Sequence, residues 1–197
     1  MLIDAQFEKI SKYADDDAVI IPTRSTAGSA GYDFYASEDI VIPPLKDLTE
    51  EKLIESIKSR AFQYNTFEEW IQRELPMTLK DVESFTKEMK NRITLVPTGI
   101  KCKMPQDYYL QLSVRSSLSL KHWLILGNGV GIIDADYYNN PDNEGHIYFQ
   151  LINLLPVPIK ISKGERFGQG VLLPYGICEN DKEVMNERTG GFGSTNE

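Results

Sequence analysis

The sequence predicts an all-β domain, a sandwich or barrel, that is interrupted by a helical insert. Outside residues 46–92, short runs rich in β-branched and aromatic residues alternate with turns, which is typical of such folds. Inside that stretch the apolar residues recur at helical spacing, glycine is absent, and 19 of 47 residues are charged against 31 of the other 150. A length of 197 residues fits one domain with an embellishment.

Eight runs are predicted as strands, and prolines stand at their ends, where a missing ladder hydrogen bond costs little. The runs cover residues 18–21, 40–42, 93–96, 108–113, 124–126, 147–155, 159–161 and 171–173. These runs lie on both sides of the helical stretch. The simplest architecture is therefore one β domain with an excursion at a point where a turn would suffice.

Three short helices are predicted within the insert. Thr49, followed by two glutamates, marks the start of the first helix. Thr66 and Glu69 form a capping box for the second helix, which Pro76 ends. Thr78 repeats the capping pattern for the third helix, whose apolar residues recur at three and four positions.

Composition and charge exclude several classes of function. No stretch approaches the roughly 18 uninterrupted apolar residues of a transmembrane helix, and the first residues lack the pattern of a signal peptide. We therefore expect a cytoplasmic protein without membrane contact. The net charge of −8 argues against nucleic-acid binding. Cys102 and Cys178 lie far apart, and His122 and His146 are isolated, so neither a disulfide framework nor a His/Cys metal site is expected.

Four polar segments interrupt the strands, and each taken alone is ambiguous. Residues 30–36 read as a turn that leads into a strand. In residues 114–121 an arginine precedes hydroxyls that could hold a phosphate, although surface loops have similar compositions. Residues 127–137 combine close glycines with two acids and a tyrosine, but they fit neither GxGxxG nor a Walker motif. Residues 188–195 have the composition of a flexible end.

In their order along the chain, these four segments and a fifth at 164–171 resemble the five motifs of the trimeric dUTPases, the deoxyuridine triphosphate nucleotidohydrolases. The matching segments are GSAGYDFYA at 28–36, VRSSLSLKH at 114–122, GNGVGIIDADYYN at 127–139, GERFGQGV at 164–171 and RTGGFGST at 188–195. The resemblance covers nearly everything except the insert. It implies a jelly-roll-like dUTPase β-barrel over residues 1–197, interrupted by the helical insert at 46–92. It also implies a flexible C-terminal arm at 186–197 that closes over the active site.

By this resemblance the chain is expected to be a dUTP diphosphatase. Water would attack the α-phosphorus of dUTP and give dUMP and pyrophosphate, which removes dUTP and supplies dUMP for thymidylate synthesis. The family forms homotrimers whose three active sites combine motifs from different subunits. The expected cofactor is Mg²⁺, held mainly by phosphate oxygens and water, with Asp33 acting through that water.

The resemblance also assigns the reacting groups. Asp134 matches the carboxylate that orients and deprotonates the attacking water. Arg115 and Ser116 match the phosphate-binding pair of the second motif, and Ser117 stands where glycine is usual. Gln169 matches an amide that hydrogen-bonds the phosphates. A triphosphate carries about four negative charges, so arginine and metal must supply positive charge near the carboxylate.

Base and sugar selection is assigned to the third motif, where free backbone groups of a strand pair can read the edge of uracil. Asn128 matches the side chain that helps to read the base. Ile132 and Ile133 lie in the adjoining hairpin, and Tyr148 occupies the position whose backbone closes the far side of the base. Tyr137 matches the tyrosine packed under deoxyribose, where a ribose 2′-hydroxyl would have no room.

The last motif is expected to close over the bound nucleotide. Phe192 would stack on the base, and Arg188 would reach the phosphates. Gly193 permits a close approach of the backbone, and Ser194 and Thr195 would add hydrogen bonds. The motif is one residue shorter between the arginine and GGFG than the family pattern.

Other interpretations remain beside this one. Tyr137 alone also fits a core tyrosine, and Asp134 alone fits a solvated turn acid. A dCTP deaminase of the same fold would need a glutamate-centred site and a different tail, and the third and fifth motifs favour a dUTPase. The aromatic residues of the insert are most simply its own small core or a docking surface on the barrel. We also hypothesise that the insert binds a protein partner or modifies oligomerisation.

Overall fold

The computed structural model describes residues 2–44 and 92–181. Its elements in chain order are β1 (Gln6–Lys9), η1 (Ser11–Tyr13), β2 (Tyr32–Tyr35), β3 (Ile40–Ile42), β4 (Thr94–Pro97), β5 (Ile100–Lys103), β6 (Tyr108–Val114), α4 (Ser116–His122), β7 (Leu124–Leu126), β8 (Gly131–Asp134), η2 (Ala135–Tyr137), β9 (Tyr148–Asn153), β10 (Ile159–Ile161) and β11 (Arg166–Pro174). Strands therefore dominate the described residues, which confirms the predicted all-β fold. The predicted helices of the insert and the predicted C-terminal arm lie outside the described residues.

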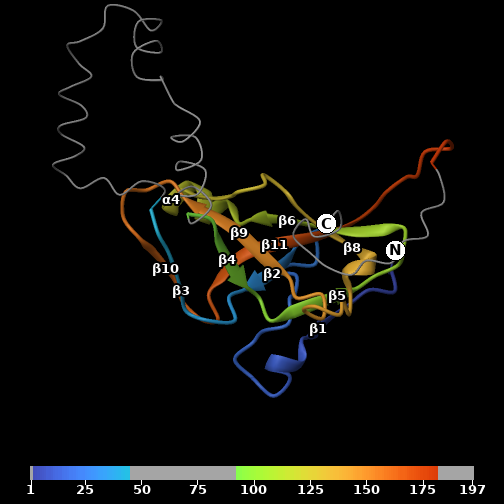
Figure 1. Ribbon diagram of the computed structural model, residues 1–197, viewed down its shortest axis with the longest axis horizontal. Helices are drawn as coiled ribbons and strands as arrows, with labels where there is room; N and C mark the ends of the chain where they lie inside the picture. Colours follow the sequence, from blue (N-terminus) through green and yellow to red (C-terminus); the bar gives the residue numbers. More distant parts are fainter. Residues whose placement is uncertain (1, 45–91, 182–197) are drawn as a thin grey trace, which may run out of the picture.

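The strands form four small antiparallel sheets (Figure 1). The largest sheet has the strand order β2-β11-β6-β8, and the next has the order β4-β9-β7. Two further pairs, β1 with β5 and β10 with β3, complete the described fold. In Figure 1, β3 and β10 lie at the left edge and β1 and β5 at the lower right. Each sheet can bury one face in a shared core, as in a barrel or sandwich.

The core is built around three phenylalanine rings. Phe34 of β2, Phe149 of β9 and Phe167 of β11 are completely buried. The Phe149 ring centroid lies 5.5 Å from that of Phe34 and 4.9 Å from that of Phe167, in tilted and edge-to-face arrangements that aromatic rings favour. Gly168 leaves the space that Phe149 occupies, because a Cβ at this position would collide with the ring. Core packing therefore requires glycine at position 168 of β11.

Strand alternation carries Gln169 to the other face of the same strand. Its neighbours Gly168 and Gly170 face core side chains, so Gln169 points the opposite way. The Cα partners of Gln169 are Asp33 on β2 and Ser113 on β6. Residues of the first and fourth motifs thus become neighbours on the outer face of the large sheet, beside Ser113, which directly precedes the second motif.

The secondary structure differs from the sequence prediction in several places, and β11 begins at Arg166 rather than at residue 171. Residues 18–21 form no strand, because Val19 is buried by a turn in which its N–H donates to the Asp16 carbonyl. The strands β1 and β5 were not predicted, and they pair with each other. Residues 116–122 fold as helix α4, of which only Leu118 is buried. The third motif contains the strand β8, which was not among the eight predicted runs but agrees with the strand pair that the family resemblance implied there.

Among residues 2–44 and 92–181, every helix is too short or too polar to span a lipid bilayer.

Candidate active site

A cavity of about 160 Å³ lies beside the paired strands β6 and β8, next to the turn that joins β7 to β8, and we call it the hairpin cavity. Six residues predicted from the sequence line it: Asn128, Ile132, Ile133, Asp134, Tyr137 and Tyr148. The sequence analysis missed five further lining residues: Leu112, Leu126, Gly131, His146 and Gln150. The structure therefore brings together Tyr148 and the third-motif residues assigned to the base, the sugar and water activation.

The pairing of β8 with β6 sets the position of Asp134. The two strands are in register from Leu112 opposite Gly131 to Tyr109 opposite Asp134. Asp134 is the last residue of β8, and its extended backbone precedes the short helix η2. The chain leaves the sheet after Asp134, and the Asp134 side chain lines the cavity.

Tyr137 is held by hydrogen bonds at its hydroxyl group. The ring lies in η2 and the residue is only 5% exposed. The hydroxyl donates to the His146 carbonyl oxygen at 3.1 Å and accepts from Asn143 Nδ2 at 2.8 Å. The residue is thus buried like a core tyrosine and also lines the cavity, which combines the two interpretations of the sequence.

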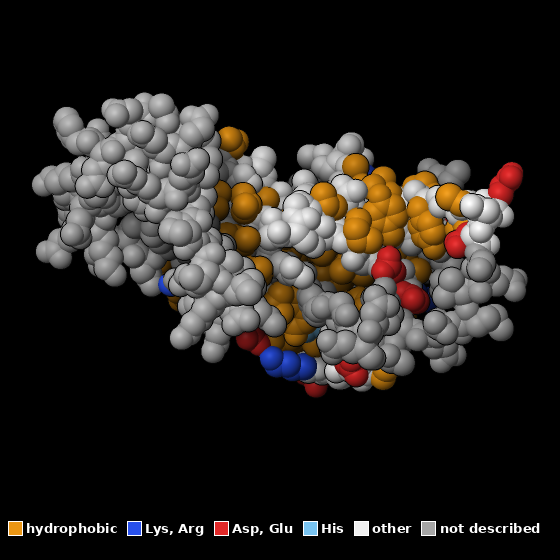
Figure 2. Space-filling model, turned by 45° about the horizontal axis from the view of Figure 1, so that its top comes forward, with side chains coloured by type: hydrophobic (Ala, Val, Ile, Leu, Met, Phe, Trp, Pro, Cys, Tyr) orange, Lys and Arg blue, Asp and Glu red, His pale blue; other side chains and the backbone are white. Residues whose placement is uncertain are grey.

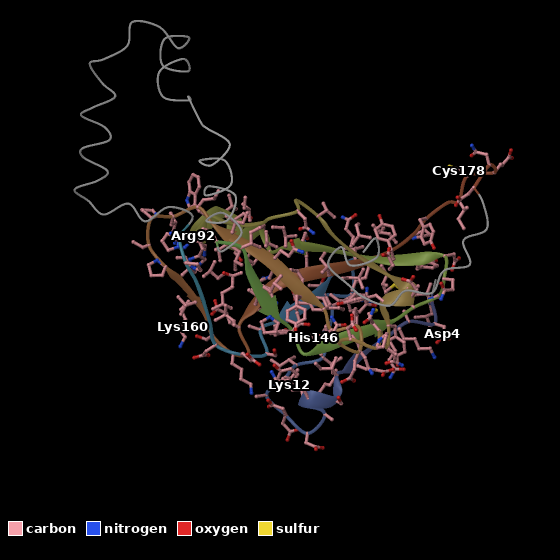
Figure 3. All side chains as sticks on the ribbon, viewed as in Figure 1. Asp4, Lys12, Arg92, His146, Lys160 and Cys178 are labelled. Carbon is pink, nitrogen blue, oxygen red and sulfur yellow. The ribbon has the colours of Figure 1, made fainter. Side chains whose placement is uncertain are left out.

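His146 and Tyr148 form one wall of the hairpin cavity. Their ring centroids lie 4.0 Å apart, and His146 lies in the interior of the molecule (Figure 3). His146 Nε2 accepts a hydrogen bond from the Gly99 N–H at 2.8 Å, so this nitrogen carries no proton. Burial, and to a smaller extent the positive charge of Lys12, lowers the pKa of His146 to about 4. Burial raises the pKa of Tyr148, so both rings are neutral near pH 7.

A second cavity, of about 430 Å³, lies on the outer face of the large sheet, and we call it the arginine cavity. Four residues predicted from the sequence line it: Asp33, Arg115, Ser116 and Gln169. The predicted residue Ser117 lies in α4, outside both linings. Hydroxyl, amide and guanidinium donors gathered in one cavity suit an anion such as a phosphate chain.

Asp33 is the carboxylate of the arginine cavity, and cationic groups surround it. Arg166 Nη1 lies 2.9 Å from Asp33 Oδ2, and Arg115 Nε lies 3.5 Å from Oδ1. The Ser25 hydroxyl also donates to this carboxylate. Arg166 was missed by the sequence analysis, although its place in the fourth motif, three residues before Gln169, is a usable signal. These contacts fix the guanidinium of Arg115 relative to the cavity.

The oxygen ligands available in the arginine cavity indicate how the predicted Mg²⁺ could be held. The described residues contain no group of three or more His, Cys, Asp or Glu side chains that could hold a metal ion. Asp33 alone supplies a carboxylate to the cavity, and its oxygens face two arginines. Such a donor set fits an ion that phosphate oxygens and water hold for the most part.

The two cavities are separate in the single chain, because no residue lines both. Asp134 and Arg115 are therefore not brought to one cavity by the fold of one subunit. The five remaining predicted residues, Arg188, Phe192, Gly193, Ser194 and Thr195, lie outside the described residues.

Comparison with known proteins identifies the family. A sequence model described as dUTPase matches residues 79–196. A deoxyuridine 5′-triphosphate nucleotidohydrolase of Lactococcus lactis is 36% identical over 190 residues, which cover 96% of this chain and 95% of the relative. The chain belongs to the dUTPase family. The family assignment made from five ordered motifs is thus confirmed, and with it the assignment of the chain as a dUTP-hydrolysing enzyme.

Solved structures show the same fold. The crystal structure of a dUTPase from Streptococcus mutans has a TM-score of 0.62 at 32% identity, covering 88% of this chain and 98% of that one. A dUTPase mutant from phage phi11 of S. aureus has a TM-score of 0.55 at 16% identity, covering 92% and 97%, and was described for its structural Mg(II) ion. The predicted jelly-roll-like dUTPase barrel is confirmed by this likeness.

Proposed function

We propose that this dUTPase hydrolyses dUTP at a site that joins the hairpin cavity to an arginine cavity. The observation that carries the proposal is that Asp134 shares the hairpin cavity with Asn128 and Tyr137. A base reader, a sugar-facing ring and a carboxylate at one cavity wall are what selective hydrolysis of a deoxynucleotide requires. The products are dUMP and pyrophosphate, so the enzyme removes dUTP and supplies dUMP for thymidylate synthesis.

The residues divide the work as follows. Asp134 orients a water molecule toward the α-phosphorus and takes its proton. Arg115, Ser116 and Gln169 bind the phosphate chain and offset its negative charge. When bound with the triphosphate, Mg²⁺ would neutralise further charge, with Asp33 holding it through water. Asn128 reads the base edge.

We also propose that the enzyme is a cytoplasmic homotrimer with shared active sites. The separation of the two cavities supports sharing, because a neighbouring subunit can bring its arginine cavity to the hairpin cavity. Exposed apolar residues support an interface: Leu95 of β4 and Ile125 of β7 emerge from one sheet. Figure 2 shows hydrophobic side chains gathered at the surface of the face that it views.

The first test measures pyrophosphate release from dUTP, dTTP, dCTP and UTP with Mg²⁺, for the wild type and for Asp134→Asn. We expect rapid turnover of dUTP alone, and a kcat about 10²- to 10⁴-fold lower in the variant, because the amide cannot accept the proton. A wild type that is inert toward dUTP, or equally active on UTP, would contradict the proposal.

The insert is proposed to bind a protein partner or to modify oligomerisation. Its two ends lie together, since Arg92 Nη1 donates to the Pro44 carbonyl at 3.2 Å. A short turn can therefore replace residues 46–92 without displacing β3 or β4. Full activity, an unchanged trimer and an unchanged set of captured proteins after this replacement would exclude the proposed role.

A further inference from the structure

The segment between η2 and β9 folds back on Tyr137, and we call residues 139–145 the return loop. The Asn140 N–H donates to the Tyr137 carbonyl at 3.2 Å, and the Glu144 N–H donates to the Asn140 carbonyl at 2.7 Å. Gly145 has a φ of +78°, and a Cβ there would collide with the Tyr137 carbonyl oxygen. The return loop is therefore packed directly against the backbone of the tyrosine.

Asn143 carries the contact between the return loop and the Tyr137 hydroxyl. Its Oδ1 accepts from the Gly145 N–H at 3.0 Å, which turns Nδ2 toward Tyr137. Nδ2 then donates to the Tyr137 hydroxyl at 2.8 Å, and the hydroxyl donates to the His146 carbonyl at 3.1 Å. Both hydrogen bonds lie on the far end of the ring from the backbone, where they fix its direction.

The outer side of the return loop is anchored to Ser11 near the N-terminus and to Lys101 of β5. The Glu144 carboxylate accepts from the Ser11 N–H at 3.1 Å and from the Ser11 hydroxyl. Lys101 Nζ donates to Asn139 Oδ1 at 2.7 Å. These hydrogen bonds therefore oppose a displacement of the return loop away from the hairpin cavity.

An open cavity of about 510 Å³ lies on that outer side, lined in part by Asn143, Glu144, His146 and Tyr148. His146 and Tyr148 line this cavity and the hairpin cavity, so they form a thin wall between the two. Asn143 and His146, the hydrogen-bond partners of the Tyr137 hydroxyl, border this open space, so the two hydrogen bonds contribute to holding the ring in place.

We propose that Asn143 is a positioning residue for Tyr137 and thereby sets the preference of the site for 2′-deoxyribose over ribose. The inference rests on the proposed function, in which the Tyr137 ring lies against the sugar. A 2′-hydroxyl needs the ring to move away. The hydrogen bond from Asn143 to the Tyr137 hydroxyl opposes that movement. A ribonucleotide can therefore bind only if this bond breaks, which lowers its affinity.

The experiment compares kcat/KM for dUTP and for UTP in wild type, Asn143→Ser and Asn143→Ala. Serine keeps a short acceptor for the Gly145 N–H but cannot reach Tyr137, which protects the loop. We define the selectivity ratio as kcat/KM for dUTP divided by kcat/KM for UTP. Loss of one neutral hydrogen bond should lower this ratio about threefold to tenfold in both variants. A general loosening of the fold would instead lower both kcat/KM values together.

Two controls separate positioning from a loss of loop structure. Asn139→Gly removes the bond to Lys101 and keeps the left-handed backbone of Asn139, whose φ is 57°, so the ratio should stay at the wild-type value. Tyr137→Phe by itself should lower the ratio, and adding Asn143→Ser should lower it no further, because loss of the hydroxyl already removes the bond from Asn143.

An unchanged ratio in a folded Asn143→Ser enzyme would overturn the inference, and so would additive effects of the two substitutions. These results differ from failure of the proposed function, which a wild type inert toward dUTP would reveal. Circular dichroism of each variant verifies folding, and Asn143→Ser carries the test if Asn143→Ala unfolds.

Discussion

Because His146 is buried, the free energy of unfolding depends on whether its imidazole is protonated. The imidazole is 4% exposed, accepts a backbone hydrogen bond and stacks on Tyr148. Protonation would leave a charge in this site and would remove the acceptor for the Gly99 N–H. Lys12 lowers the pKa further, whereas Glu38 and Glu144 raise it by a smaller amount than burial lowers it.

The wild-type free energy of unfolding should fall as the pH drops from 6.5 to about 4. In that range the unfolded chain binds a proton at His146 and the folded chain, with a pKa of about 4, does not. The loss is on the order of 3 kcal/mol when complete. Urea unfolding of His146→Gln at several pH values should show a flatter profile in this window.

The matched control for that measurement is His122→Gln. His122 is exposed at the end of α4, so its replacement should leave the pH profile of the wild type unchanged. Carboxylates with lowered pKa values, such as Glu38, lose their stabilising contacts mainly below their ordinary range near 4.5, which leaves the window above it to His146. A parallel profile for His146→Gln and wild type would contradict the assignment.

At the scale of the elements, one face of β11 packs in the core and the other face carries Gln169 to the arginine cavity. Gly168→Ala would place a methyl group against the Phe149 ring, and we expect a loss of about 1–3 kcal/mol in the free energy of unfolding. Gly176→Ala is the matched control, because nothing lies within 4 Å of a Cβ built there. Denaturant titration should thus show a large shift for the first variant and almost none for the second. Equal shifts would mean that the close approach of Phe149 does not limit position 168.

The element boundaries show what local pattern can and cannot predict. The strands at residues 40–42, 124–126 and 159–161 were predicted with correct bounds, because turns and prolines flank short apolar runs. Residues 18–21 have the same composition but no neighbouring strand to pair with in the structure. Helix α4 was missed because its serines are weak helix formers, and tertiary contacts at Leu118 decide its state.

The site was predictable where motifs carry it and not where folding brings distant residues together. Asp134, Asn128 and Tyr137 come from one motif, and the structure places all three at one cavity. The partners of Tyr137 and Asp33 were not foreseen. Asn143 lies in a loop without a motif, and Arg166 reaches Asp33 only through the pairing of β11 with β2. Such contacts depend on strand register, which no local pattern specifies.

At the scale of the whole molecule, the proposed trimer with shared active sites predicts complementation between inactive subunits. Asp134→Asn and Arg115→Ala should each abolish turnover alone. In trimers refolded from an equal mixture, about a quarter of the sites would combine an intact Asp134 with an intact Arg115 from a neighbouring subunit. We therefore expect about a quarter of the wild-type rate per site from the mixture. Absence of recovery in mixed trimers, with the two parent variants as baselines, would show that each site lies within one chain.

The contact between Arg92 and Pro44 has a consequence for how this sequence can change over generations. Since the chain leaves β3 and returns to β4 at almost the same place, the span between them can grow or shrink with little effect on either strand. Lengthening a closed loop raises its entropic penalty only logarithmically, by about 0.6 kcal/mol for each doubling. Segments of different length can therefore be gained or lost between β3 and β4 during evolution, while the strands that carry the candidate site keep their sequence and pairing.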